Sequence, residues 1–187
     1  RVVAQRIEGK KGSTFANYED EFEYLISAGI ALNVQAISTP TFPLIESSGK
    51  NLLKLYLNDV GILTSILYGS NIRAILEDER SINLGSVYES VVASELIAHG
   101  YNLFYYDNRS KGEVDYLIDD YDSLSAVPIE VKSGKDYTIH SALNTFVKND
   151  DYHVKKAFVL SNTREITTNG KITYLPIYDV MFLQNNS

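Results

Sequence analysis

The order of the hydrophobic patterns after Gly85 is the feature that most constrains the fold. These patterns predict helix 86–98, strands 102–107, 113–119 and 126–133, helix 139–149, strands 155–160 and 171–175, and a short terminal helix. Three successive strands between two helices imply a mixed sheet with helical cover, that is, an α/β or α+β layer fold.

The preceding part of the chain predicts a smaller unit. A helix that Asn17 would cap, ending at Gly29, is followed by an alternating strand over residues 30–36, and this pair resembles the end of a winged helix. The loop that contains Pro40 and Pro43 is the expected hinge. A short apolar strand at 52–57 and one or two helices within 59–79 come next. We therefore expect a winged-helix-like segment and linker over 1–57 and a second domain over 58–187.

Composition limits the classes of protein that fit. The chain has no cysteine, so disulfides and thiolate metal sites are excluded, and a reducing cytoplasm fits. No apolar run approaches the roughly 18 residues that cross a membrane, and residues 1–6 lack the apolar stretch of a signal peptide. The sequence therefore predicts a cytoplasmic protein without a membrane partner. Because it begins at Arg1 rather than Met, we expect it to be a piece of a longer chain.

The net charge of −7 bears on nucleic-acid binding. Non-specific binding of a duplex depends on clustered lysine and arginine, and acidic residues outnumber basic ones in both halves of the chain. Any binding of nucleic acid by this chain alone is expected to be weak.

Glu89 is the first candidate site residue. A helical projection places it near the middle of an apolar arc formed by Tyr88, Val92, Ala93, Leu96 and Ile97. A buried carboxylate costs several kcal/mol unless it is paired or bound to a metal. The alternative is a glutamate that is tolerated at a partly hydrated helix start.

Two predicted strands carry the other candidates. Alternation places Val114, Tyr116 and Ile118 on one face of the first strand, with Glu113 and Asp115 opposite. In the next strand Val127, Ile129 and Val131 share a face, and Glu130 and Lys132 share the other. Charges on a strand that is otherwise apolar suggest a site, although an exposed edge strand can also carry Glu-x-Lys as a surface salt bridge.

These residue types fit a magnesium or manganese site. Asp115 and Glu130 can supply hard oxygen ligands, and Glu89 would complete the set. Lys132 would meet an attacking water or a phosphate oxygen.

At these positions the sequence resembles the PD-(D/E)xK nuclease-like superfamily, whose core is helix, three strands, helix, strand. Four blocks more closely resemble the C-terminal domain, of unknown function, of a large prokaryotic AAA+ ATPase family: residues 54–61, 85–89, 112–115 and 129–134. The resemblance runs from about Tyr18 to Leu183 and implies a restriction-endonuclease-like sheet. It also implies an N-terminal ATPase partner domain in the same protein, whose P-loop this chain lacks.

Residues around the predicted site have weaker claims. Arg109 and Lys111, in the turn before the acidic strand, are candidate phosphate contacts, and a solvated hairpin explains them equally well. Glu113 is a third ligand or a rim acid. Asp119, Asp120 and Asp122 are expected in a solvated turn.

The preferred function is a magnesium- or manganese-dependent phosphodiesterase domain of an AAA+ ATPase that acts on DNA or RNA. The rival is a non-catalytic module that binds nucleic acid or protein for the ATPase, since this superfamily also includes members that do not cut. A plain DNA-binding regulator is disfavoured by the acidic charge.

Overall fold

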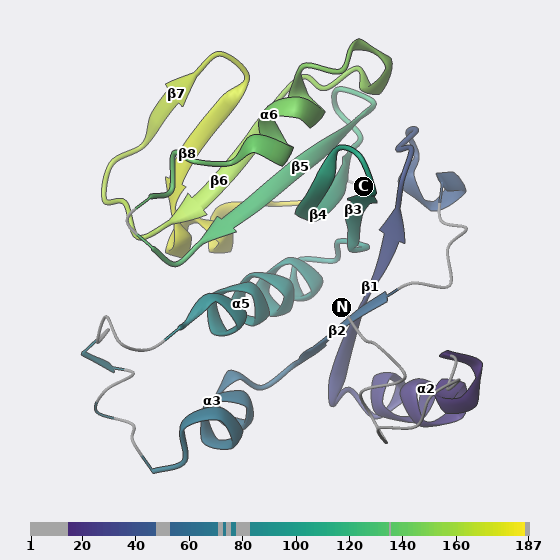
Figure 1. Cartoon of the computed structure of the whole chain (residues 1–187), viewed down its shortest axis with the longest axis vertical. Helices are drawn as coiled ribbons and strands as arrows, with labels where there is room; N and C mark the ends of the chain where they lie inside the picture. The colour runs from purple at the N-terminus through teal and green to yellow at the C-terminus, as the bar shows by residue number, and fades with distance from the viewer. Residues whose placement is uncertain are drawn as a thin grey trace.

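A single mixed sheet organises the chain. The computed structural model describes residues 15–47, 53–70, 73, 76, 77, 83–134 and 136–185. Within them an eight-stranded sheet has the order β2-β1-β3-β4-β5-β6-β8-β7 (Figure 1). The strands are β1 (Ala31–Ile37), β2 (Leu53–Leu57), β3 (Phe104–Asn108), β4 (Gly112–Asp120), β5 (Ser125–Lys132), β6 (Ala157–Ser161), β7 (Thr167–Asn169) and β8 (Ile172–Pro176).

Short helices cover the sheet and join its strands. The α-helices are α2 (Glu19–Ser27), α3 (Val60–Tyr68), α5 (Gly85–Ala98) and α6 (Ser141–Val147). The 3-10 helices are η1 (Phe15–Tyr18), η2 (Leu44–Ser47), η3 (Asp150–Tyr152) and η4 (Ile177–Phe182). Over the part of the chain that the structure describes, no helix is long and apolar enough to cross a membrane.

The predicted α/β layer fold is confirmed. The elements α5, β3, β4, β5, α6 and β6 follow one another in the predicted order, and their ends lie within two residues of the predicted ones. β3, β4 and β5 are antiparallel neighbours, whereas β5, β6 and β8 run parallel, so the sheet is mixed. The prediction missed β7, whose three exposed residues are too short to show a pattern.

Each face of the sheet packs against its own helix. On one face, Val92, Ala93 and Leu96 of α5 join a core cluster with the inward residues of β1, β3, β4 and β5. On the other, Leu143 and Phe146 of α6 pack with residues of β3, β4, β6 and β8. Figure 1 shows α5 and α6 on opposite sides of β5. The central strands are therefore buried on both faces, and a charged side chain there needs a partner.

The N-terminal strands extend the same sheet. β1 pairs antiparallel with β2 and parallel with β3, so both strands precede residue 58 and still belong to the sheet of the later elements. The division into two domains stays a prediction. The expected cap at Asn17 is wrong, because η1 occupies residues 15–18 and α2 begins after Tyr18. α3 ends before Gly69, whose φ of +59° suits glycine, and most of 70–82 lies outside the described residues.

Candidate metal and phosphate site

A β-bulge places Asp115. Residues 104–106 of β3 stand opposite residues 114–117 of β4, so β4 carries one extra residue. As a result both Asp115 and Tyr116 lie opposite Tyr105. Bulges re-aim side chains and are frequent next to functional sites.

The bulge also corrects the predicted alternation along β4. Val114 packs in the core on the α6 side, whereas Tyr116 and Ile118 pack in the core on the α5 side. The prediction that these three residues share a face is therefore wrong. A regular two-residue period fails where an extra residue is inserted.

Asp115 is mostly buried, and two partners of its side chain are seen among the described residues. Its Oδ2 accepts a hydrogen bond of 2.8 Å from the backbone N–H of Val131, and its Oδ1 lies 3.9 Å from the Lys54 Nζ. Burial raises the pKa of Asp115 to about 8, and repulsion from Glu130 and Glu89 adds to this effect, whereas Lys54 and the Val131 N–H oppose it. Both other predicted carboxylates therefore contribute to the raised pKa of Asp115.

Glu130 lies on β5 with only 7% of its surface exposed. Its Oε1 is 2.7 Å from the Lys132 Nζ. Its Oε2 is buried and finds no hydrogen-bond partner among the described residues. An unsatisfied buried acceptor costs about 1–3 kcal/mol, and more when it is charged, so this oxygen is suited to a cation or a donor.

Glu89 faces the sheet, as the helical projection predicted. The Tyr56 hydroxyl donates a hydrogen bond of 2.6 Å to its Oε2, and the Tyr116 hydroxyl donates one of 2.8 Å to its backbone oxygen. Two tyrosines from separate strands thus fix both the side chain and the backbone of this residue.

Lys54 is a site residue that sequence reasoning missed. Its side chain is 6% exposed, and its Nζ lies 2.6 Å from Glu113 Oε1 and 4.8 Å from the centre of the Tyr105 ring. The signal in the sequence was the alternation within β2, because Lys54 and Tyr56 share the buried face of an otherwise apolar strand.

The three basic residues predicted to contact phosphate lie in different environments. Lys132 pairs with Glu130 and is partly exposed. Arg109 is exposed in the turn after β3. The Lys111 Nζ lies 5.3 Å from the centre of the Tyr152 ring, a member of the core on the α6 side. A role in phosphate binding stays a prediction for all three.

Within the described ranges, no three or more His, Cys, Asp or Glu side chains already form a metal-binding group. The carboxylates instead have lysine, tyrosine and backbone partners, as given above. Metal binding by Glu89, Asp115 and Glu130 therefore stays a prediction.

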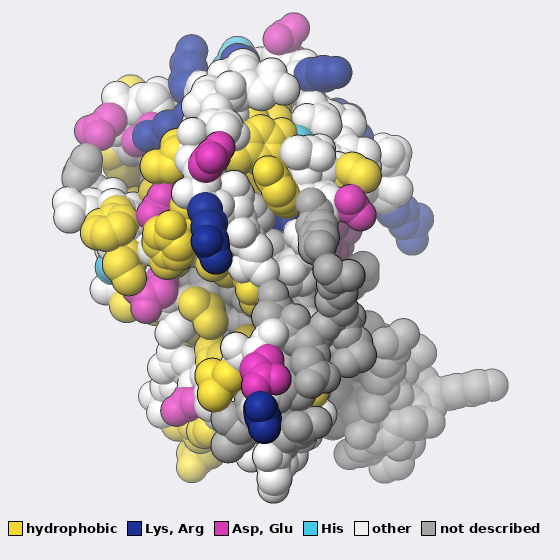
Figure 2. Space-filling view, turned by 90° about the vertical axis from the view of Figure 1, so that its left-hand side faces the viewer, with side chains coloured by type: hydrophobic (Ala, Val, Ile, Leu, Met, Phe, Trp, Pro, Cys, Tyr) yellow, Lys and Arg dark blue, Asp and Glu magenta, His cyan; other side chains and the backbone are white. Residues whose placement is uncertain are grey.

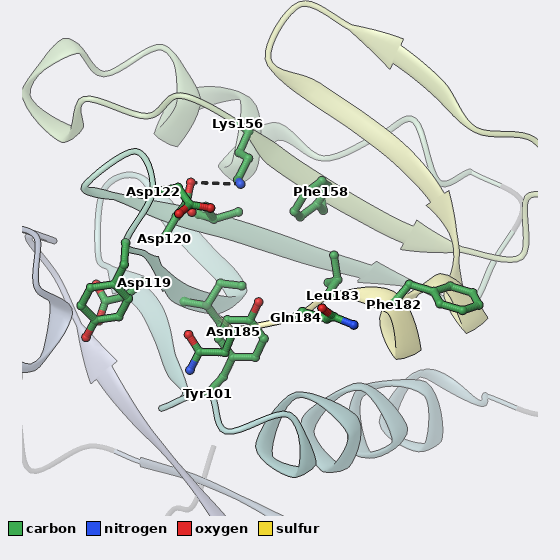
Figure 3. Close-up of a pocket in the computed structure, with 13 residues that line it drawn as sticks. Tyr101, Asp119, Asp120, Asp122, Lys156, Phe158, Phe182, Leu183, Gln184 and Asn185 are labelled. Atoms are coloured by element: carbon green, nitrogen blue, oxygen red, sulfur yellow. Dashed lines mark ion pairs between the residues drawn. The ribbon is translucent and has the colours of Figure 1, made fainter. Parts of the chain in front are cut away.

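A second acidic region lies at the far end of β4. Asp119, Asp120 and Asp122 line a cavity of about 300 Å³ together with Lys156 and aromatic side chains (Figure 3). Asp119 Oδ1 accepts a hydrogen bond of 3.0 Å from the Leu44 N–H, and Asp120 Oδ2 lies 3.0 Å from the Lys156 Nζ. The expectation of a solvated turn is wrong for Asp119 and Asp120, because both are half-buried residues of β4.

The surface shows little sign of a polyanion-binding patch on the side seen in Figure 2. There the lysine and arginine side chains are dispersed, and aspartate and glutamate side chains lie among them. This distribution agrees with the net charge of −7.

A family profile described as "Domain of unknown function (DUF4143)" matches residues 84–180, just over half of the 187 residues. The matched range runs from the start of α5 into η4 and so includes all four predicted catalytic residues. Comparison with curated proteins and with solved structures finds no match.

Proposed function

Because the chain belongs to this family of domains of unknown function, we propose an activity from its site: a metal-dependent phosphodiesterase domain of PD-(D/E)xK type that acts on nucleic acid. In this proposal it is the C-terminal domain of an AAA+ ATPase. The observation that carries the proposal is the buried Glu130 Oε2, which has no hydrogen-bond partner among the described residues. It lies near an Asp115 carboxyl whose pKa is raised by burial and, in addition, by the charges of Glu130 and Glu89.

The donor set fits magnesium or manganese. Both ions prefer oxygen ligands, and Asp115, Glu130 and Glu89 provide carboxylates, of which Asp115 is repelled by the other two. A divalent ion would relieve that repulsion and satisfy the buried Glu130 Oε2. Asp115, Glu130 and Glu89 are the residues that would hold it.

The side chains of this chain have separate roles in the proposed reaction. When bound, the ion supplies Lewis acidity toward a phosphate oxygen and lowers the pKa of water. The Val131 N–H orients Asp115, and the Tyr56 hydroxyl orients Glu89. The Lys132 ammonium, which lies 2.7 Å from Glu130 Oε1, would stabilise negative charge on the phosphate.

A non-catalytic interaction module is the second candidate. It is favoured by the ion pairs of Lys132 with Glu130 and of Lys54 with Glu113, which neutralise the carboxylates as a purely structural cluster would. The acidic net charge also favours a protein partner over a polyanion.

The deciding experiment is a nuclease assay. Single- and double-stranded DNA and RNA are incubated with magnesium, manganese or a chelator, with the wild-type chain alone and with longer natural chains that contain it. We expect weak, salt-sensitive, metal-dependent cutting that Lys132→Ala reduces by at least about 100-fold. The control Lys156→Ala, which removes the lysine partner of Asp120, should cut like wild type.

Two results would overturn the enzyme proposal in favour of the interaction module. One is the absence of cutting by any of these chains with either metal. The other is equal cutting by wild type and a folded Lys132→Ala variant.

A further inference from the structure

The strand β2 contributes a positively charged side chain, Lys54, to the carboxylate site. We propose that Lys54 takes the place of a second metal ion, so that the site binds a single divalent cation. This inference rests on the proposed metal site and specifies its composition.

Lys54 lies where a bridging cation would lie. Its Nζ is 2.6 Å from Glu113 Oε1 and 3.9 Å from Asp115 Oδ1, so one ammonium group joins two carboxylates of β4. In two-metal sites the ions are about 3.5–4 Å apart and share a carboxylate ligand. Asp115 is the residue that would have to be shared, and its Oδ1 already faces Lys54.

The charges of the cluster match one divalent ion. Glu89, Glu113, Asp115 and Glu130 carry −4 when ionised, and Lys54 and Lys132 carry +2, so the formal charge is −2. One divalent cation neutralises this set. A second would leave excess positive charge beside Asp115 and Glu130, which are largely buried, and such a charge is costly.

The ammonium group is held firmly. Its side chain is 6% exposed and lies against the face of the Tyr105 ring, a favourable cation–π contact. The β2 backbone at Lys54 is paired with Val34 of β1, which is fully buried. The pairing therefore fixes the backbone from which the Lys54 side chain reaches Glu113 and Asp115.

The experiment counts bound ions. Isothermal titration of the wild-type chain with manganese chloride should give one site. Lys54→Met removes the ammonium while keeping an unbranched side chain, and it frees Glu113 and Asp115, so it should give two. Lys54→Arg keeps the charge and should give one, as should the distant control Lys156→Met.

Electron paramagnetic resonance of wild type with excess manganese gives a second readout that does not depend on the folding of a variant. We expect isolated ions. A spin-coupled manganese pair in wild type would overturn the role of Lys54, as would one unchanged site in a folded Lys54→Met variant.

These outcomes are distinct from failure of the proposed function. If wild type binds two ions that Asp115→Asn releases, the metal site stands and the role of Lys54 is wrong. If wild type binds no manganese, the proposed metal site itself is wrong, and the inference about Lys54 is wrong with it.

Discussion

Acidic side chains lie at both ends of β4, but their partners differ, and so does the direction in which the pKa of the central aspartate is shifted. At the end near the bulge, burial and neighbouring carboxylates raise the pKa of Asp115 to about 8, and Glu130 Oε2 finds no donor among the described residues. At the far end, burial alone would raise the pKa of Asp120, but the Ser123 hydroxyl and Lys156 outweigh it and lower the pKa.

The difference shows that acidic composition alone does not mark a site. Asp120 is stabilised as a carboxylate by its own partners, so it has little need of a further cation. Asp115 is opposed by two other carboxylates and only partly compensated by Lys54. Unbalanced charge in a buried place is what distinguishes the candidate site.

The largest effect expected to distinguish the two ends of β4 is on the pH dependence of the free energy of unfolding. In a chelator, Asp115 holds a proton in the folded state between its unfolded pKa of 3.8 and its folded pKa of about 8. Folding stability should therefore fall as pH rises through this window, by roughly 3 kcal/mol between pH 5 and 8. Asp115→Asn should remove most of this slope, as measured by urea unfolding at several pH values.

Asp120 should behave in the opposite sense. Its pKa is lowered on folding, so its contribution to stability is present above the unfolded pKa and is lost as pH falls below about 3.8. Asp120→Asn should leave the slope between pH 5 and 8 unchanged. Equal slopes in wild type and Asp115→Asn would break the contrast between the two ends.

A slightly smaller effect concerns metal-induced stabilisation. Manganese at about 100 times its dissociation constant should stabilise wild type by about 2.7 kcal/mol, because it binds the folded state. This corresponds to a rise in Tm of roughly 5–10 °C in a chain of this size, measured by thermal unfolding. The rise should vanish in Asp115→Asn and remain in Asp120→Asn. The reverse pattern would place the ion at the Asp119–Asp122 end.

The smallest effect compares one hydroxyl donor at each end. Tyr56→Phe removes the hydrogen bond to Glu89 Oε2 and should lower the free energy of unfolding by roughly 1–2 kcal/mol. Ser123→Ala removes the donor to Asp120, a partly exposed carboxylate that water can reach, and should cost less than about 1 kcal/mol. Denaturant unfolding measures both, and a larger cost for Ser123→Ala would contradict the account.

Local sequence patterns were sufficient to predict much of the fold and part of the candidate site. Hydrophobic periods of helix and strand act over a few residues, so they predicted α5 through β6 and the inward direction of Glu89. The same alternation marked Glu130 and Lys132 as charges on a buried strand. These features depend only on neighbours in the sequence.

The features that were missed depend on distant pairing. Lys54 and Tyr56 reach the site only because β1 joins β2 to β3 in the same sheet. The bulge at Asp115 is a property of the β3–β4 register and left no composition signal. Asp119 gains its partner from the Leu44 N–H, 75 residues away.

A crystal structure of the chain grown with manganese tests the central claim most directly. The account predicts one anomalous-scattering peak within about 2.3 Å of oxygens from both Asp115 and Glu130. Glu89 should lie next to this peak. It also predicts that Lys54 keeps its contact with Glu113. A peak only among Asp119, Asp120 and Asp122, or no peak beside Asp115 at saturating manganese, would contradict the account.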